Sequence, residues 1–275
     1  MAIRSAAMYR FLVRPKWIAF HLLVIGAVVL MVNLAFWQIR RLDERKDFNR
    51  EVTTRAEQPI ADFATLVTPA TDPDSVEWRT VTATGTYVAD LQLVVVNRGQ
   101  AGQAGINVVT PLQLDDGRLL LVNRGFVPEP GTAPAPPAGT VTVEGRVRAS
   151  QHRGLGQLSD PSSGPLTEVQ RIDIPRIAEQ LPGDVAQVYV DLLASRPSQG
   201  DVPIPLPDPE LTEGPHLSYT IQWFIFSVCV LVGWVLAVRR SARKRAAELV
   251  SAAQPGVAAD PDELTAGSPP ARPSA

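Results

Sequence analysis

Cysteine is almost absent from this chain of 275 residues, in which Cys229 is the one cysteine. Histidine is also scarce, with three residues. A single cysteine excludes an internal disulfide, a zinc site built from thiolates, an iron–sulfur cluster and a CxxC redox pair. Residues 40–215 contain neither cysteine nor methionine. The soft ligands on which copper delivery depends are therefore missing from most of the chain.

Charged residues are also scarce, at 20% of the chain, whereas apolar residues make up 45%. Soluble domains usually carry about a quarter charged residues, so part of the chain is expected to lie in a membrane. The 26 basic and 28 acidic residues nearly balance, which argues against nucleic acid as a partner. No GxGxxG, P-loop, HExxH or GxSxG motif is present, so the sequence predicts no enzyme.

Two apolar runs, residues 18–37 and 219–238, are each 20 residues long and contain no Asp, Glu, Lys or Arg. At about 1.5 Å per residue, each run would reach about 30 Å as a helix, which is the thickness of the hydrocarbon core. We predict transmembrane helices over residues 18–39 and 216–238. The alternatives are a cleaved signal peptide for the first run and a buried core helix for the second, and the length of each run disfavours them.

The charges that flank the two runs predict their orientation. Residues 1–17 carry four basic and no acidic residues, and residues 239–248 carry five basic and one acidic residue. The segment between the runs, residues 40–215, contains 16 basic and 24 acidic residues. The positive-inside rule predicts a multi-pass protein of the cell membrane, with both termini cytoplasmic and the central domain on the external side. Within residues 239–275, the stretch from Ala246 onward is expected to be a disordered tail.

The central segment is predicted to be a mostly antiparallel β domain with minor helix, which makes the whole chain an α+β membrane protein. Residues 40–56 are expected to form a helical stalk that continues the first span, and it is either solvated or docked on a partner. The β domain is expected over about residues 78–193 as a small sheet or barrel. Its strands are predicted at residues 78–87, 91–97, 106–114, 119–127, 140–149 and 185–193, from apolar alternation and β-branched runs.

The connections between these strands have their own signals. A hairpin turn is predicted at residues 115–117, which read Asp-Asp-Gly, and a loop is predicted over residues 98–105. A short helix is expected at residues 175–181, and a Pro-rich linker over residues 197–215 returns to the membrane. Gly85 lies inside a strand pattern, where a bulge or a close backbone approach would explain it.

Two histidines are candidates for chemistry outside the hydrocarbon core. His152 lies in a predicted loop without a catalytic motif around it, so a solvated side chain is the favoured interpretation. His216 lies at the external mouth of the second span, where an imidazole can ligate haem iron; the alternative is a polar anchor at the headgroups. Tyr219 and either Gln222 or Trp223 are expected on the same helical face as His216.

The outer end of the first span is expected to face this group. Asn33 and Trp37 are placed opposite His216 and Tyr219 by their position near the end of the apolar run. Trp37 and Gln38 are then expected to close the other side of a site at the mouth of the two spans.

Four stretches of the chain resemble the surfeit locus protein 1 family, whose members are assembly factors of cytochrome c oxidase. They are LAFWQIRRL at residues 34–42, WRTVTATGTY at 78–87, the pair GINVVTPL and LVNRGFVP at 105–112 and 121–128, and PHLSYTIQWF at 215–224. The resemblance covers residues 33–238. The chain departs from the family pattern at Ala35, where glycine is usual, at Phe126, where tryptophan is usual, and at residues 213–215, where asparagine often precedes the histidine.

The resemblance implies an assembly or maturation factor, a transient chaperone that assists the insertion or stabilisation of haem a in a haem–copper oxidase. His216 occupies the position of the family's proposed haem-iron ligand, and Tyr219, Trp223, Trp37 and Gln38 are its expected haem-binding neighbours. The implied partners are the catalytic subunit of the oxidase or a respiratory supercomplex, together with membrane lipid. The alternative is a structural accessory subunit of the oxidase complex that binds no haem.

Overall fold

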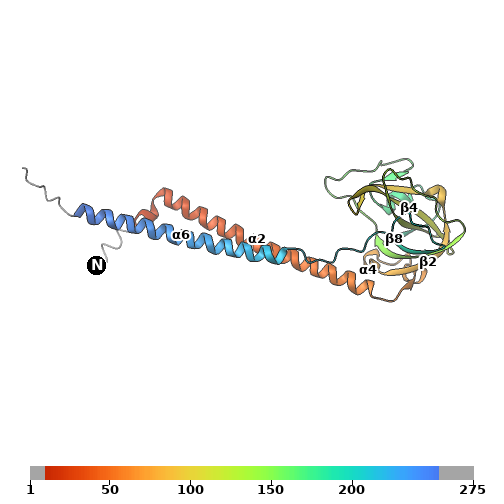
Figure 1. Cartoon of the computed structure of the whole chain (residues 1–275), viewed down its shortest axis with the longest axis horizontal. Coiled ribbons are helices and arrows are strands. Elements are labelled where there is room, and N and C mark those ends of the chain that lie inside the picture. The colour runs from red at the N-terminus through yellow and green to blue at the C-terminus, as the bar shows by residue number, and fades with distance from the viewer. Residues whose placement is uncertain (1–9, 254–275) are drawn as a thin grey trace, which may run out of the picture. The chain divides into compact units, whose positions relative to one another are not determined.

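The structure is a computed structural model that describes residues 10–253, and the chain divides into two compact units (Figure 1). One unit consists of Met1–Asp43 together with Gly214–Ala275, and the other is Glu44–Glu213. Two long apolar helices flank a sheet domain that closes into a barrel. This confirms the predicted α+β membrane fold.

The long helices are α2 (Pro15–Ala56), which follows the short 3-10 turn η1 (Arg10–Val13), and α6 (His216–Ala253). Both contain a stretch that is long and apolar enough to cross a membrane. The tail predicted to be disordered from Ala246 is instead helical as far as Ala253. Alanine, glutamate and leucine dominate this stretch, and they are strong helix formers. Residues 254–275 lie outside the described part of the chain.

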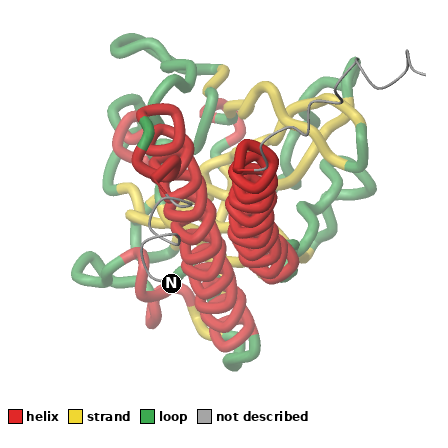
Figure 2. Tube along the Cα trace, turned by 90° about the vertical axis from the view of Figure 1, so that its left-hand side faces the viewer, coloured by secondary structure: helices red, strands yellow, loops and turns green. Residues whose placement is uncertain are grey.

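In the helical unit, α2 and α6 run antiparallel and side by side (Figures 1 and 2). Trp234 Nε1 donates a hydrogen bond of 2.9 Å to His21 Nδ1, and the rings of Phe36 and Phe224 meet edge to face. Buried and half-buried positions recur at alternating spacings of four and three residues, which is typical of helices packed along their length. On α2 they are Trp17, His21, Val24, Val28, Met31, Ala35, Gln38 and Leu42; on α6 they are His216, Thr220, Trp223, Ser227, Val230, Trp234, Ala237 and Ser241.

The other unit is built on a barrel whose strands pair in the closed order β2-β6-β8-β5-β4-β2. Most neighbouring strands are antiparallel, as predicted, but β5 and β8 are parallel. The barrel strands are β2 (Thr80–Tyr87), β4 (Gln103–Leu114), β5 (Leu119–Pro128), β6 (Thr140–Ala149) and β8 (Val185–Arg196). Three further strands extend the sheet at its edges: β1 (Ala61–Asp62), β3 (Leu93–Gln100) and β7 (Glu168–Val169).

Two apolar clusters stabilise this unit, with short helices covering the sheet: α3 (Phe63–Leu66), α4 (Pro73–Val76), α5 (Ile174–Ala178) and η2 (Ala89–Leu91). Alternate residues of the barrel strands point inward, because successive side chains of a strand face opposite sides. The first cluster includes Val81, Leu112, Leu120, Val143 and Val190, and the second includes Leu93, Val109, Leu121, Ile177 and Tyr189.

The prediction of a loop over residues 98–105 is wrong, because β3 and β4 form a hairpin through a two-residue turn. Gln100 lies opposite Gln103, and both Ala101 and Gly102 have positive φ angles, 51° and 79°. Such a turn matches the right-handed twist of the strands. Alanine at its first position lacks the usual Asn-Gly or Asp-Gly signal, so the strands were predicted to end too early. The start of the strand predicted over residues 91–97 was also misplaced, since Ala89–Leu91 forms η2 and β3 begins at Leu93.

Gly85 lies where β2 closes the barrel, opposite both Leu114 of β4 and Val141 of β6. A Cβ atom at this position would lie 2.2 Å from the backbone oxygen of Gln113. The predicted close backbone approach is therefore confirmed. Only glycine allows the two strands to meet at this distance.

Gly85→Glu is expected to destabilise the β unit by at least about 3 kcal/mol, because the strands must separate and a charge enters the closure. The test is the protease resistance of the β unit in the full-length protein. Gly99→Glu is the matched control, since a Cβ there meets only the backbone oxygen of Gln103, at an ordinary contact distance of 3.6 Å. Equal resistance of wild type and Gly85→Glu would contradict this placement.

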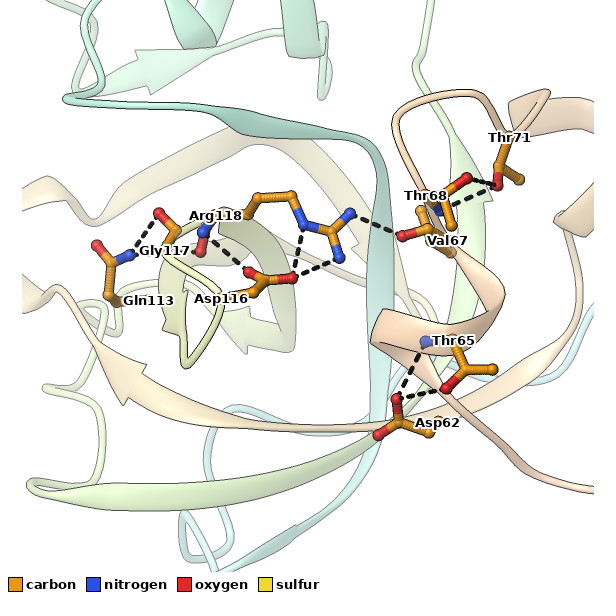
Figure 3. A network of polar contacts seen from close by, with 9 residues as sticks. All are labelled: Asp62, Thr65, Val67, Thr68, Thr71, Gln113, Asp116, Gly117 and Arg118. Atoms are coloured by element: carbon orange, nitrogen blue, oxygen red, sulfur yellow. Dashed lines mark hydrogen bonds and ion pairs between the residues drawn. The ribbon is translucent and has the colours of Figure 1, made fainter.

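The segment that joins the stalk to the barrel is held by the polar network shown in Figure 3. Asp62 caps α3 by accepting a hydrogen bond of 3.1 Å from the Thr65 N–H. Arg118 donates to the carbonyl oxygen of Val67 at 2.7 Å and is held in turn by Asp116. The hydrogen bond from Arg118 lowers the pKa of the Asp116 carboxyl.

The stalk and the linker are both tied to the β unit. Asn49 on α2 donates a hydrogen bond of 2.9 Å to the Leu211 carbonyl of the linker. Ile204 of the same linker pairs with Phe126 through two backbone hydrogen bonds of 2.8 Å. The stalk is thus docked on its own domain, and Glu51 and Arg55, four residues apart along the stalk, form an ion pair.

Candidate functional site

His216 is the first residue of α6, and its ring meets Gln38 of α2 inside the helical unit. The distance between His216 Nδ1 and Gln38 Oε1 is 2.8 Å. Gln38 is only 9% exposed, so its carboxamide is held within the helix pair. With the amide oxygen as acceptor, Nδ1 carries the hydrogen and Nε2 keeps its lone pair. Histidines that bind metals are usually held in this way, with the other ring N–H donated to an oxygen.

The Nε2 edge of His216 is bordered by Gly214. A Cβ atom built on Gly214 would lie 3.5 Å from both Nε2 and Cδ2 of the ring. The φ angle of Gly214 is 68°, which favours glycine at this position. Glycine at position 214 therefore places no side chain against this edge of the imidazole.

The structure brings together only part of the group expected around His216. Trp223 lies on the same packed face, half-buried, with its ring edge to face against Phe226 at 6.0 Å. Tyr219 is 46% exposed, and Gln222 is also exposed, so neither lies on that face. The packed row continues from His216 through Thr220 and Trp223, so Tyr219 and Gln222 each precede a packed position by one residue and point to another face of the helix.

The residues expected on the first span also separate into two groups. Gln38 meets His216, whereas Trp37 is 46% exposed on a neighbouring face of α2. Asn33 donates a hydrogen bond of 2.8 Å to the carbonyl oxygen of Val29 in its own helix. The expected pairing of Asn33 and Trp37 with His216 is therefore replaced by the pair of Gln38 and His216.

The donor set at this mouth fits haem iron, which needs a single protein nitrogen on one axial side because the porphyrin supplies the rest. A metal held by protein side chains alone would need several ligands. Within residues 10–253, no three His, Cys, Asp or Glu side chains are grouped to hold a metal ion.

A buried polar cluster in the β unit was missed by the sequence analysis. Burial raises the pKa of the Asp191 carboxyl, although Arg148 and a hydrogen bond of 2.8 Å from Asn123 favour its charged form. The Arg148 guanidinium also lies 4.0 Å over the ring of Trp78, which meets Phe48 of the stalk edge to face. These residues come from three strands and the segment before β2, so no local pattern could predict them. Their contacts fasten the stalk to the barrel.

The residues of this site lie within the part of the chain that matches a known protein family. The model of the SURF1 family matches residues 25–228, which include both Gln38 and His216. The chain belongs to the SURF1 family. This confirms the resemblance to the surfeit locus protein 1 family, which is linked to cytochrome c oxidase assembly.

Relatives of this SURF1 family member cover most of its length. An uncharacterised SURF1-like protein of Mycobacterium bovis is 32% identical over 232 residues, 81% of this chain and 83% of the relative. A SURF1-like protein of Monosiga brevicollis is 30% identical over 241 residues, 80% of this chain and 88% of the relative. A SURF1-like protein of Caenorhabditis elegans is 23% identical over 253 residues, 82% of this chain and 76% of the relative.

Proposed function

We propose that this SURF1 family member is a maturation factor of a haem–copper cytochrome c oxidase, and that it holds haem a through His216 for the catalytic subunit. The observation that carries the proposal is the hydrogen bond between His216 Nδ1 and Gln38 Oε1, which keeps the ring hydrogen on Nδ1 and leaves the Nε2 lone pair available to iron. Family membership supports the link to oxidase assembly. The role is one of binding and transfer, without catalysis by the chain itself.

Each residue at the mouth has a task in this proposal. His216 Nε2 donates its lone pair to the iron, and Gln38 fixes the tautomer and the ring orientation. The exposed rings of Trp37 and Tyr219 offer apolar surface to the macrocycle, with Trp223 supporting the helix pair from inside. Bound haem a supplies the redox-active iron that the oxidase requires. A single axial histidine suits a transient carrier, since the cargo must leave again.

His216→Ala is expected to lower the yield of mature oxidase by about tenfold or more, because the iron loses its only protein ligand in the proposed site. The measurement is oxidase activity and haem a content of membranes from cells that depend on this chain. Gln222→Ala is the matched control, a truncation at an exposed position of the same helix. Normal oxidase from cells with His216→Ala would favour the structural accessory role without haem.

The proposed setting is the cell membrane, with both termini cytoplasmic and the β unit external. Basic side chains gather at the end of the helix pair opposite His216, where they can bind the anionic headgroups of membrane lipids. A hollow of about 530 Å³ there is lined by Leu236, Arg239, Arg240, Arg243 and Lys244, and one of about 470 Å³ is lined by Arg14, Pro15, Lys16, Trp17 and Arg245. Membrane lipid is therefore part of the proposed set of partners.

A reporter that is active only in the cytoplasm, fused after Ala275, is expected to be active, because basic flanks stay on the cytoplasmic side. A second fusion inside the β unit, after Gly117, serves as the control and is expected to be inactive. A stable but inactive fusion after Ala275 would contradict the two-span orientation.

A further inference from the structure

A cavity in the β unit is lined by residues that are distant in sequence. Its volume is about 690 Å³, which is enough for a small organic ion. Its lining comes from four places in the chain: the end of β3, the residues after β6, the loop at 156–158 and the residues after β7. The polar lining residues are Asn97, Arg98, Gln151, His152, Gln157, Gln170 and Arg171.

The glutamine oxygens of this lining already accept hydrogen bonds from the protein. Gln151 Oε1 accepts from the Ile172 N–H at 3.0 Å, and Gln157 Oε1 accepts from the Gly154 N–H at 2.9 Å. Gln170 Oε1 accepts from Asn97 Nδ2 at 3.1 Å. The amide NH₂ groups of Gln157 and Gln170 have no protein acceptor among the described residues. What the glutamines still offer the cavity is therefore donors, which suit an acceptor ligand.

The charges of the cavity also favour a ligand that carries hydrogen-bond acceptors. Arg171 is paired with the buried carboxylate of Asp160 at 3.6 Å and donates to the carbonyl of Leu158. Arg98 donates to the carbonyl of Gln170 at 2.5 Å, and no carboxylate lies within ion-pair distance of it in residues 10–253. Burial lowers the pKa of Arg98, and the neighbouring charge of Arg171 lowers it further. Among the described residues, Arg171 thus has a carboxylate partner, whereas Arg98 has none.

We propose that this cavity binds a small carboxylate- or phosphate-bearing anion, with the Arg98 guanidinium as its main contact and His152 at the rim. The bound oxyanion takes the place of the carboxylate that Arg98 lacks. Arginine presents its donors in a planar fork that matches two oxygens of either group. His152 was predicted from the sequence to be a solvated side chain. In this site it adds a third hydrogen-bond donor, from the segment after β6, to the two of the Arg98 fork.

The test is calorimetric titration of the purified full-length chain with inorganic phosphate and, separately, with succinate. Binding of either anion is expected, with the affinity lowered about tenfold or more in Arg98→Met, since one charge-assisted contact is worth about 1.5–3 kcal/mol. Arg50→Met is the matched control and should bind as wild type, because Arg50 is exposed on the stalk. The two anions distinguish phosphate from carboxylate as the preferred group.

His152→Gln is a second variant, and it is not expected to disturb folding. His152 is exposed and makes no protein hydrogen bond among the described residues. The substitution is expected to weaken binding about threefold and to leave the unfolding temperature unchanged. Equal affinity of wild type, Arg98→Met and His152→Gln, or no binding of either anion to the wild type, would overturn the proposal. The result does not depend on haem binding at His216, so the two proposals can fail separately.

Discussion

Arg124→Met is expected to unfold the β unit, or to destabilise it by at least about 3 kcal/mol. Arg124 is 0% exposed, yet no carboxylate in the described chain pairs with it. Its guanidinium donates instead to the side-chain oxygens of Gln92 and Gln199 and to the carbonyl oxygens of Pro134 and Ala135, at 2.9–3.2 Å. Methionine keeps most of the volume but donates nothing, so several buried acceptors lose their partner.

Burial lowers the pKa of Arg124, which records the cost of holding this charge inside the protein. The ring of Tyr87, 5.7 Å from the guanidinium, offsets part of that cost, and burial raises the pKa of Tyr87 to about 12. The measurement is thermal unfolding of the full-length chain, followed at Trp78, the one tryptophan of the β unit. Arg50→Met serves as control, since exposed ion pairs contribute about 0–1 kcal/mol. Equal unfolding temperatures for the two variants would contradict this role.

Gln38→Leu is expected to lower the affinity for haem about 10- to 100-fold, while the helix pair stays folded. Leucine fills the same space in an apolar interface, so packing is kept and only the hydrogen bond to His216 is lost. Without that bond, the imidazole is free to take the other tautomer or to rotate. The measurement is haem affinity of the purified protein by absorbance titration.

Gln222→Leu is the matched control for Gln38→Leu, because it is the same chemical change at an exposed position of α6. It should leave the haem affinity unchanged. If both variants bind haem as tightly as the wild type, Gln38 has no part in holding His216 for the metal.

Much of the fold follows from local patterns. The apolar runs predicted both long helices, and α6 begins at His216 as expected. Strict alternation predicted β6 to the residue, and the Asp-Asp-Gly turn predicted the hairpin of β4 and β5. The parallel pairing of β5 with β8 could not be predicted in this way, because it joins segments that are distant in sequence.

The candidate site was predicted only in part for a physical reason. Trp37 and Gln38 are adjacent, and a helix turns by about 100° between neighbours, so one of them must face α6 and the other must not. Hydropathy alone favours tryptophan inside an apolar pair. The partner His216 decides otherwise, since a buried amide and a buried imidazole each need a hydrogen bond. A contact between residues so far apart in the sequence cannot be predicted from the local pattern of either helix.

Haem binding at His216 is tested most directly by the absorption spectrum of the full-length chain purified from cells that make haem a. We expect a haem spectrum for the wild type, a weaker one for Gln38→Leu and none for His216→Ala at equal amounts of folded protein. A His216→Ala protein with the same haem content and the same spectrum as the wild type would contradict this expectation.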